Sequence, residues 1–212
     1  MSKPTSHSSP PGARERIVLT ALKLFYQDGI RATGIDKIIA ESGVAKMSFY
    51  RHFPSKNDLI AEFLRRRHEV WMQRFTEAVE TKLAQGSGGL EIIADVLRHW
   101  FDDPDFRGCA FINTLAETPL PESQQHQIIR DHKASLESYI TDLATRLGSP
   151  APQTTASAAM IIIEGTIIRA HMGADPTVCD TCKDLLKRIS RSQRKPNESS
   201  VKRNEPPLLP GL

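Results

Sequence analysis

Apolar residues recur every three or four positions along most of the chain between residues 13 and 190. This spacing places them along one side of an α-helix. No alternating apolar run is flanked by an Asn-Gly or Asp-Gly turn, so no strand is predicted. The pattern therefore predicts an all-α fold of about nine helices. They are expected at residues 14–28, 35–41, 46–52, 56–83, 90–102, 108–117, 122–147, 152–172 and from Asp175-Pro176 to about 190.

The ends of the first four expected helices carry residues that cap or break helices. Gly29 follows the first helix, where a left-handed cap belongs. Thr33 and Asp36 are spaced like a capping box at the start of the second helix. Gly43 suits the tight turn before the third helix, because glycine adopts a positive φ without strain. Ser55 is a good N-cap for the fourth helix. We therefore expect two helices, a tight turn, a short third helix and then a long helix.

The same pattern predicts a division of the chain into four parts. Residues 1–12 are rich in Ser, Pro and Gly and are expected to form a disordered arm. Residues 191–212 contain four prolines and five basic residues, which predicts a flexible basic tail. Between them we expect a helical head at residues 13–55 and a helical body at residues 56–190.

The overall composition is that of an ordinary globular protein, with 39% hydrophobic and 25% charged residues. No run of about 18 apolar residues is present, so no membrane-spanning helix is expected. The polar first residues lack the apolar stretch of a secretion signal. Three cysteines, at positions 109, 179 and 182, are too few for a disulfide framework. These features predict a cytoplasmic protein.

Charge is distributed unevenly along the chain. Residues 13–67 contain 11 Lys and Arg against 6 Asp and Glu, whereas residues 68–190 contain 11 against 17. A basic head on an acidic body indicates that the head meets a polyanion such as DNA. Chance segregation of charge is the alternative.

Two short helices joined by a glycine-containing turn, inside this basic head, are typical of a helix-turn-helix motif. Phe49 and Phe53 are four residues apart and share one face of the third helix, which is expected to face the core. The remaining positions are then expected to point sideways or outward: Met47, Ser48, Tyr50 and Arg51. Arginine forms bidentate hydrogen bonds with guanine, and methionine can contact a thymine methyl. This face is therefore a candidate DNA reader.

Residues 31–59, RATGIDKIIAESGVAKMSFYRHFPSKNDL, resemble the signature of the TetR family of transcriptional regulators. The spacing from Gly43 through Tyr50 to Lys56 matches that signature without a gap. Two positions depart from it, since Gly34 and Ala45 stand where hydroxyl residues are usual, and each departure removes a cap or a phosphate bond. The resemblance implies a homodimeric DNA-binding protein with a helix-turn-helix head and a divergent ligand-binding body.

The resemblance also implies roles for the matching positions. Thr33, Tyr50 and Lys56 would contact phosphates, and His52 would add a further phosphate contact. The residues implied to face the major groove of double-stranded operator DNA are Lys46, Met47, Ser48 and Arg51.

The helix at 152–172 is apolar over much of its circumference, so some surface must cover it. The natural cover is the helix at 176–190 together with a twofold copy of this pair, which is also the dimer interface that the resemblance implies. Burial wholly within one subunit is the alternative.

The body is expected to hold a pocket for a small organic effector, with mostly apolar walls and a few polar groups. Residues 107–117 resemble a sequence that recurs in one TetR subgroup and mix aromatic side chains with Asn and Glu. The candidate ligand-binding residues are Trp71, Phe75, Trp100, Phe111, Asn113, Glu117, Met160 and Glu164. A role in the core or in a helix cap is the alternative for each of them. Glu164 has the further alternative of an ion pair with Arg169 or a bond between subunits.

No motif of an enzyme is present: the sequence lacks P-loop, GxGxxG, HExxH and GxSxG patterns. We therefore expect no catalytic residue, no cofactor and no metal. Cys179-x-x-Cys182 is a single CxxC pair, which is weak support for zinc without a second pair of ligands.

Three functions fit these observations. The first is a transcriptional regulator, typically a repressor, that a small-molecule effector releases from its operator. The second is a thiol-based redox sensor or enzyme that uses Cys179 and Cys182, with Cys109 as a further thiol. The third is a helical interaction protein whose basic head attaches to DNA or to a membrane without reading sequence.

Overall fold

The structure is a computed structural model that describes residues 11–86, 88–118, 123–173, 175 and 177–192. Nine α-helices and no strand occur in these residues, which confirms the predicted all-α class. The helices are α1 (Ala13–Gln27), α2 (Ile35–Ser42), α3 (Lys46–His52), α4 (Lys56–Ala84), α5 (Ile92–Phe101), α6 (Ala110–Glu117), α7 (Gln124–Arg146), α8 (Pro152–His171) and α9 (Val178–Ser192).

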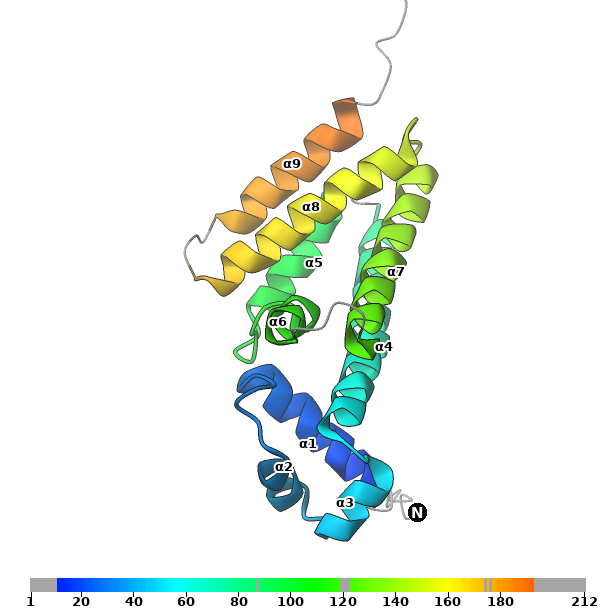
Figure 1. Ribbon diagram of the computed structural model, residues 1–212. Helices are drawn as coiled ribbons and strands as arrows, with labels where there is room; N and C mark the ends of the chain where they lie inside the picture. Colours follow the sequence, from blue (N-terminus) through cyan, green and yellow to red (C-terminus); the bar gives the residue numbers. More distant parts are fainter. Residues whose placement is uncertain (1–10, 87, 119–122, 174, 176, 193–212) are drawn as a thin grey trace, which may run out of the picture.

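The molecule is elongated, with α1, α2 and α3 gathered at one end (Figure 1). Helix α4 leads away from this head, and α7 packs alongside it. At the opposite end α8 and α9 lie side by side, and α5 packs against α9. No helix in the described part of the chain is long and apolar enough to cross a membrane.

The head is joined to the body mainly by packing between α1 and α4. The rings of Phe25 and Phe63 meet edge to face at 5.5 Å between centroids. Arg66 of α4 binds Glu15 of α1 at 2.9 Å. This contact makes Arg66 part of an ion pair within the subunit.

Two of the predicted helix starts have different outcomes. Ser55 caps α4 as expected, because its hydroxyl accepts from the Asp58 N–H while the Asp58 carboxylate accepts from the Ser55 N–H. The capping box predicted for α2 is wrong. Gly34 is the N-cap, and the Thr33 hydroxyl donates instead to the backbone carbonyls of Leu24 and Gly29.

Helix α9 differs from the prediction at both ends. It begins at Val178, after the expected Asp175-Pro176, of which Pro176 lies outside the described residues. It continues to Ser192, so the first two residues of the expected tail are helical. Leu186 is buried whereas Leu185 is exposed, so Leu186 is the leucine of this helix that faces the core. Residues 193–212 of the expected tail and residues 1–10 of the expected arm lie outside the described residues.

A pair of histidines, buried His132 and half-buried His68, lies where α4, α6 and α7 meet. The Nδ1 atoms of His68 and His132 are 3.0 Å apart, so one ring donates to the other and the acceptor must be neutral. The Phe111 ring stacks on His132 at 3.6 Å between centroids. Burial, Lys133 and His68 together lower the pKa of His132 to about 3.

This shift predicts that acid destabilises the protein. An unfolded histidine takes up a proton near its ordinary pKa of about 6.5, whereas folded His132 does not until the pH is far lower. The unfolded state therefore binds more protons in this window, and stability falls as the pH drops through it. We expect the contribution of His132 to lower the free energy of unfolding by about 1 kcal/mol between pH 7.5 and 5.5, measured by urea denaturation. His132→Gln should flatten the dependence and His52→Gln should not; an equal slope in the parent and in His132→Gln would contradict the assignment.

Candidate DNA-reading face and interdomain cleft

The head has the geometry of a helix-turn-helix motif. Helices α2 and α3 are joined at Gly43, which has φ +63° and so adopts the left-handed conformation that the sequence predicted. Phe49 and Phe53 are 0% and 3% exposed and fix the rotation of α3 against the core of the head. The inward orientation predicted for these two rings is confirmed.

The opposite side of α3 is open to solvent. Met47 is 78% exposed, and Lys46, Tyr50 and Arg51 are also exposed. Ser48 and His52 are half-buried at the borders of this face. The sequence therefore predicted the outward face of α3 correctly, although contacts of its side chains with DNA stay a prediction.

Three other candidates for DNA contact lie in different settings. The Thr33 side chain is fully buried and its hydroxyl bonds inside the head, so its predicted phosphate contact is withdrawn. Lys46 forms an exposed ion pair with Asp36 at 3.3 Å, which costs little to break. Lys56, the first residue of α4, donates to the Ile30 carbonyl at 2.6 Å, and burial lowers its pKa. Of these three, Lys46 and Lys56 keep donors available for a phosphate.

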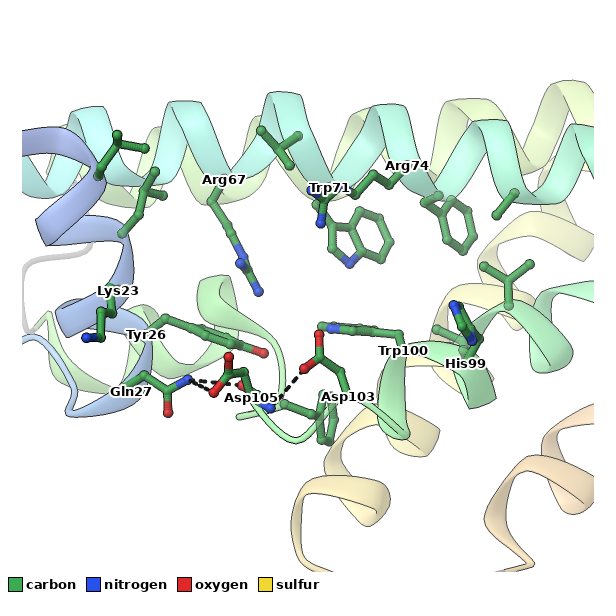
Figure 2. A pocket seen from close by; sticks show the side chains of 18 residues that line it. Lys23, Tyr26, Gln27, Arg67, Trp71, Arg74, His99, Trp100, Asp103 and Asp105 are labelled. Atoms are coloured by element: carbon green, nitrogen blue, oxygen red, sulfur yellow. Dashed lines mark hydrogen bonds between the residues drawn. The ribbon is translucent and has the colours of Figure 1, made fainter. Parts of the chain in front are cut away.

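A cleft of about 590 Å³ lies between the head and the body (Figure 2). Its walls come from α1, α4, α5 and the loop that follows α5. Three predicted ligand-binding residues meet there: Trp71, Phe75 and Trp100. Trp71 stacks on Phe75 at 4.8 Å and meets Trp100 edge to face at 5.7 Å between centroids. These rings form an apolar wall for a small organic molecule.

The polar side chains of this cleft were not predicted. They include Lys23, Tyr26, Arg67, Arg74 and Asp103. One signal was present in the sequence, because Arg67, Trp71 and Arg74 follow the spacing of a single helical face. The contribution of α1 could not be found in this way, because only the tertiary structure brings α1 beside α4.

The remaining predicted ligand-binding residues do not line this cleft, although Phe111 lines a small cavity of about 10 Å³ beside it together with Trp71 and Trp100. Phe111 stacks on His132, and Met160 is buried in the core. The Asn113 amide donates to the Arg107 carbonyl at 2.8 Å. Glu164 pairs with Lys133 at 3.0 Å and not with Arg169, which binds Asp175 at 2.8 Å.

Glu117, the last of these candidates, connects the body to the head. Its carboxylate accepts from the backbone N–H of Arg31 at 2.6 Å, and its backbone carbonyl accepts from the Arg31 side chain at 3.1 Å. Nearby, the Tyr26 hydroxyl donates to the Gly108 carbonyl and accepts from the Arg107 N–H, both at 3.0 Å. The head is therefore hydrogen-bonded to both ends of the segment from the loop after α5 to the end of α6.

The cysteine pair that suggested thiol chemistry lies in the core. Cys179 and Cys182 are buried and free, and burial raises the pKa of both thiols. A raised pKa keeps a thiol protonated, and the protonated form is the unreactive one. Both residues are small side chains on the buried side of α9.

Comparison with known proteins agrees with this geometry. The family model described as "Bacterial regulatory proteins, tetR family" matches residues 17–63. The HTH-type transcriptional regulator LmrA of Bacillus subtilis is 25% identical over 183 residues, which are 83% of this chain and 97% of that protein. The HTH-type transcriptional repressor NemR of Escherichia coli is 28% identical over 120 residues, 55% of this chain and 57% of that protein. The crystal structure of SCO4454, a TetR-family transcriptional regulator from Streptomyces coelicolor, has a TM-score of 0.78 at 27% identity and covers 88% of this chain and 92% of that one.

An all-helical fold with an exposed basic helix in a helix-turn-helix defines a DNA-binding regulator of transcription. The head carries the DNA-binding domain of the TetR family, as its resemblance to the TetR signature predicted, and the chain is similar over most of its length to regulators of that family. Its relatives are regulators and not enzymes, and its function is regulatory in the same sense.

Substitutions on the two faces of α3 are expected to affect stability by very different amounts. Phe49→Ala removes a fully buried ring and should lower the free energy of unfolding by about 3–5 kcal/mol. Met47→Ala trims an exposed side chain and should change it by no more than about 0.5 kcal/mol. Urea denaturation followed by circular dichroism measures both values. A large loss for Met47→Ala would mean that this residue is packed in solution.

Proposed function

We propose that this protein is a dimeric transcriptional regulator that binds a palindromic operator and is released from it by a small organic effector. The observation that carries the proposal is the solvent-exposed side of α3, opposite the buried Phe49. Both DNA and metabolite-sized effectors meet such a regulator in the cytoplasm, where we place it.

The reading of DNA is assigned to α3 and its flanks. Arg51 is exposed and charged, and an arginine reads guanine through two hydrogen bonds in the major groove. Met47 offers an apolar contact to a thymine methyl. We assign base or phosphate contacts to the remaining candidates, which are Lys46, Ser48, Tyr50, His52 and Lys56.

The dimer is assigned to α8 and α9. Ile161 and Met172 are 73% and 71% exposed, and they lie with Ile168 along one face of α8. Gly165 lies on the same face and has open space beside it, which permits another helix to approach closely. Leu185 adds an exposed apolar side chain on α9. Pairing of this face with its twofold copy would cover the apolar stripe and hold two heads for half-sites about 34–36 Å apart or a multiple of that.

Release by an effector follows from the position of the cleft. The cleft is bounded by α1 of the head and by α4 and α5 of the body, so its occupant contacts both. A ligand that binds one arrangement of α1 and α4 better than another shifts the protein toward that arrangement. A shift of α1 moves α3 with it and changes the spacing of the two heads, which lowers the affinity for the operator.

Sequence-specific reading is tested by selecting bound DNA from a random pool and then measuring variants on the selected operator. Arg51→Ala should weaken operator binding by about 1–3 kcal/mol, or about 5- to 150-fold in Kd, and relax the preference at one base position. Arg65→Ala, which removes an exposed arginine from α4, is the matched control and should bind like the parent. If Arg51→Ala binds both operator and scrambled DNA like the parent, the assigned reading face is wrong. Equal affinity of the parent for operator and scrambled DNA would instead favour attachment without sequence reading.

The dimer face is tested by placing a charge in its centre. Ile161→Asp should convert the protein from dimer to monomer at micromolar concentration and lower operator affinity at the same time, because a carboxylate would be buried without a partner. Leu115→Asp changes another exposed apolar residue, on α6, and should leave the dimer intact. Sedimentation velocity measures the oligomeric state of both variants. A monomeric parent, or a dimer that survives Ile161→Asp, contradicts this interface.

A further inference from the structure

The cleft between head and body contains both tryptophans of the chain, Trp71 and Trp100. Together with Phe75 and Phe106 they make its inner wall aromatic. Such a wall favours a flat, aromatic occupant, since aromatic rings add specific edge and stacking contacts to the burial of area.

The cations of the cleft decide the charge of this occupant. Lys23, Arg67 and Arg74 line it, and no carboxylate lies within 4.0 Å of their nitrogen atoms in the described part of the chain. By contrast Arg66, the neighbour of Arg67, is paired with Glu15. Lys23 and Arg74 are exposed and Arg67 is half-buried. Three cations against the two carboxylates of Asp103 and Asp105 leave the lining of the cleft with a net positive charge.

The acidic residues of the cleft are already engaged. The Asp105 carboxylate accepts from the Gln27 amide at 3.1 Å. The Asp103 carboxylate accepts from the Asp105 backbone N–H at 2.9 Å (Figure 2). These bonds hold both acids in the loop after α5, on the wall opposite Arg67 and Arg74 (Figure 2). Each carboxylate keeps its negative charge, but neither forms an ion pair with Arg67 or Arg74 in the described part of the chain.

Arg67 is held in a position to receive an anion. Its guanidinium carbon lies 4.0 Å from the centroid of the Tyr26 ring. The Tyr26 hydroxyl is itself fixed by Gly108 and Arg107. A guanidinium stacked on a ring keeps its N–H groups in its own plane, where they remain available for a bidentate bond to a carboxylate. Burial also lowers the pKa of Arg67, and a bound anion would offset the cost of burying its positive charge.

We propose that the cleft binds a planar aromatic carboxylic acid, with the carboxylate on Arg67 and the ring against Trp71 and Trp100. This assignment rests on the proposed function in one respect: it takes the occupant of this cleft to be the effector. Arg74 and Lys23 add long-range attraction. The ligand bridges the body, through α4 and α5, and the head, through Tyr26 of α1.

The proposal is tested with three probes of one shape: 2-naphthoate, 2-naphthamide and 2-naphthylmethylammonium. Isothermal titration calorimetry on the full chain without DNA gives the affinities. The two indole N–H signals in ¹H–¹⁵N spectra report occupancy directly, because both tryptophans line the cleft. We expect 2-naphthoate to bind about tenfold or more tighter than the amide, the ammonium to bind weakest, and both indole signals to shift.

Variants of α4 locate the carboxylate. Arg67→Leu should abolish the preference for 2-naphthoate over 2-naphthamide while leaving the binding of the amide within about twofold. Arg67→Lys keeps the charge but loses the planar fork, so an intermediate preference is expected and provides a test if the leucine variant folds poorly. Arg65→Leu removes an exposed charge from the same helix and should retain the full preference.

Several results would overturn the proposal: equal affinity of the parent for 2-naphthoate and 2-naphthamide, preference for the ammonium, no binding of any probe, or a preference that persists in Arg67→Leu. Operator binding separates this proposal from the proposed function. If 2-naphthoate binds through Arg67 and leaves operator affinity unchanged, the anion site stands and its role in release fails. If the operator is read specifically but the probes show no preference, the DNA-binding function stands and the anion site fails.

Discussion

Helix α1 is packed on two sides, and the rest of the structure depends on this double contact. One side, with Ile17, Ala21 and Leu24, is buried in the core of the head and packs against α2, α3 and α4. Another side, with Lys23 and Tyr26, lines the cleft toward the body. Because a close-packed core transmits displacement instead of absorbing it, a movement of α1 carries the reading helix with it. The same helix therefore belongs to the DNA-binding unit and to the candidate effector site.

The hydrogen bonds between head and body give this arrangement a defined position. Tyr26 is bonded to the loop after α5, and Arg31 is bonded to Glu117 at the end of α6. Both contacts involve backbone groups, which have fixed positions, and Tyr26 also lines the cleft. A ligand in the cleft thus meets a joint in which apolar packing of α1 on α4 is supplemented by a few directional bonds.

Three arginines of the first third of the chain, Arg51, Arg66 and Arg67, lie in different surroundings. Arg66 and Glu15 hold head and body together within the subunit, whereas Arg51 on α3 is exposed to solvent. Arg67 is directed toward Tyr26 and the cleft. Of these three arginines, Arg66 has a structural position, Arg51 is the one proposed to meet DNA, and Arg67 is the one proposed to meet a ligand. Their separation is set by which helix face each occupies.

The sequence by itself determined the elements and their faces. Helical periodicity, Gly43 and Ser55 predicted the order and ends of the head helices, and the spacing of Phe49 and Phe53 predicted which side of α3 is free. These features depend on interactions between residues close in sequence, so a single chain contains the information. The resemblance of residues 31–59 to the TetR signature supplied the family.

Only the tertiary structure decided which distant residues meet. Trp71 and Trp100 could be proposed as pocket residues from the sequence. Tyr26 lines the cleft only because α1 packs on α4, and Glu117 lies outside it because α6 ends against the head. Glu164 found Lys133 on another helix and not Arg169 on its own. Such pairings depend on how helices cross, which local periodicity does not encode, since many crossings bury the same apolar stripes.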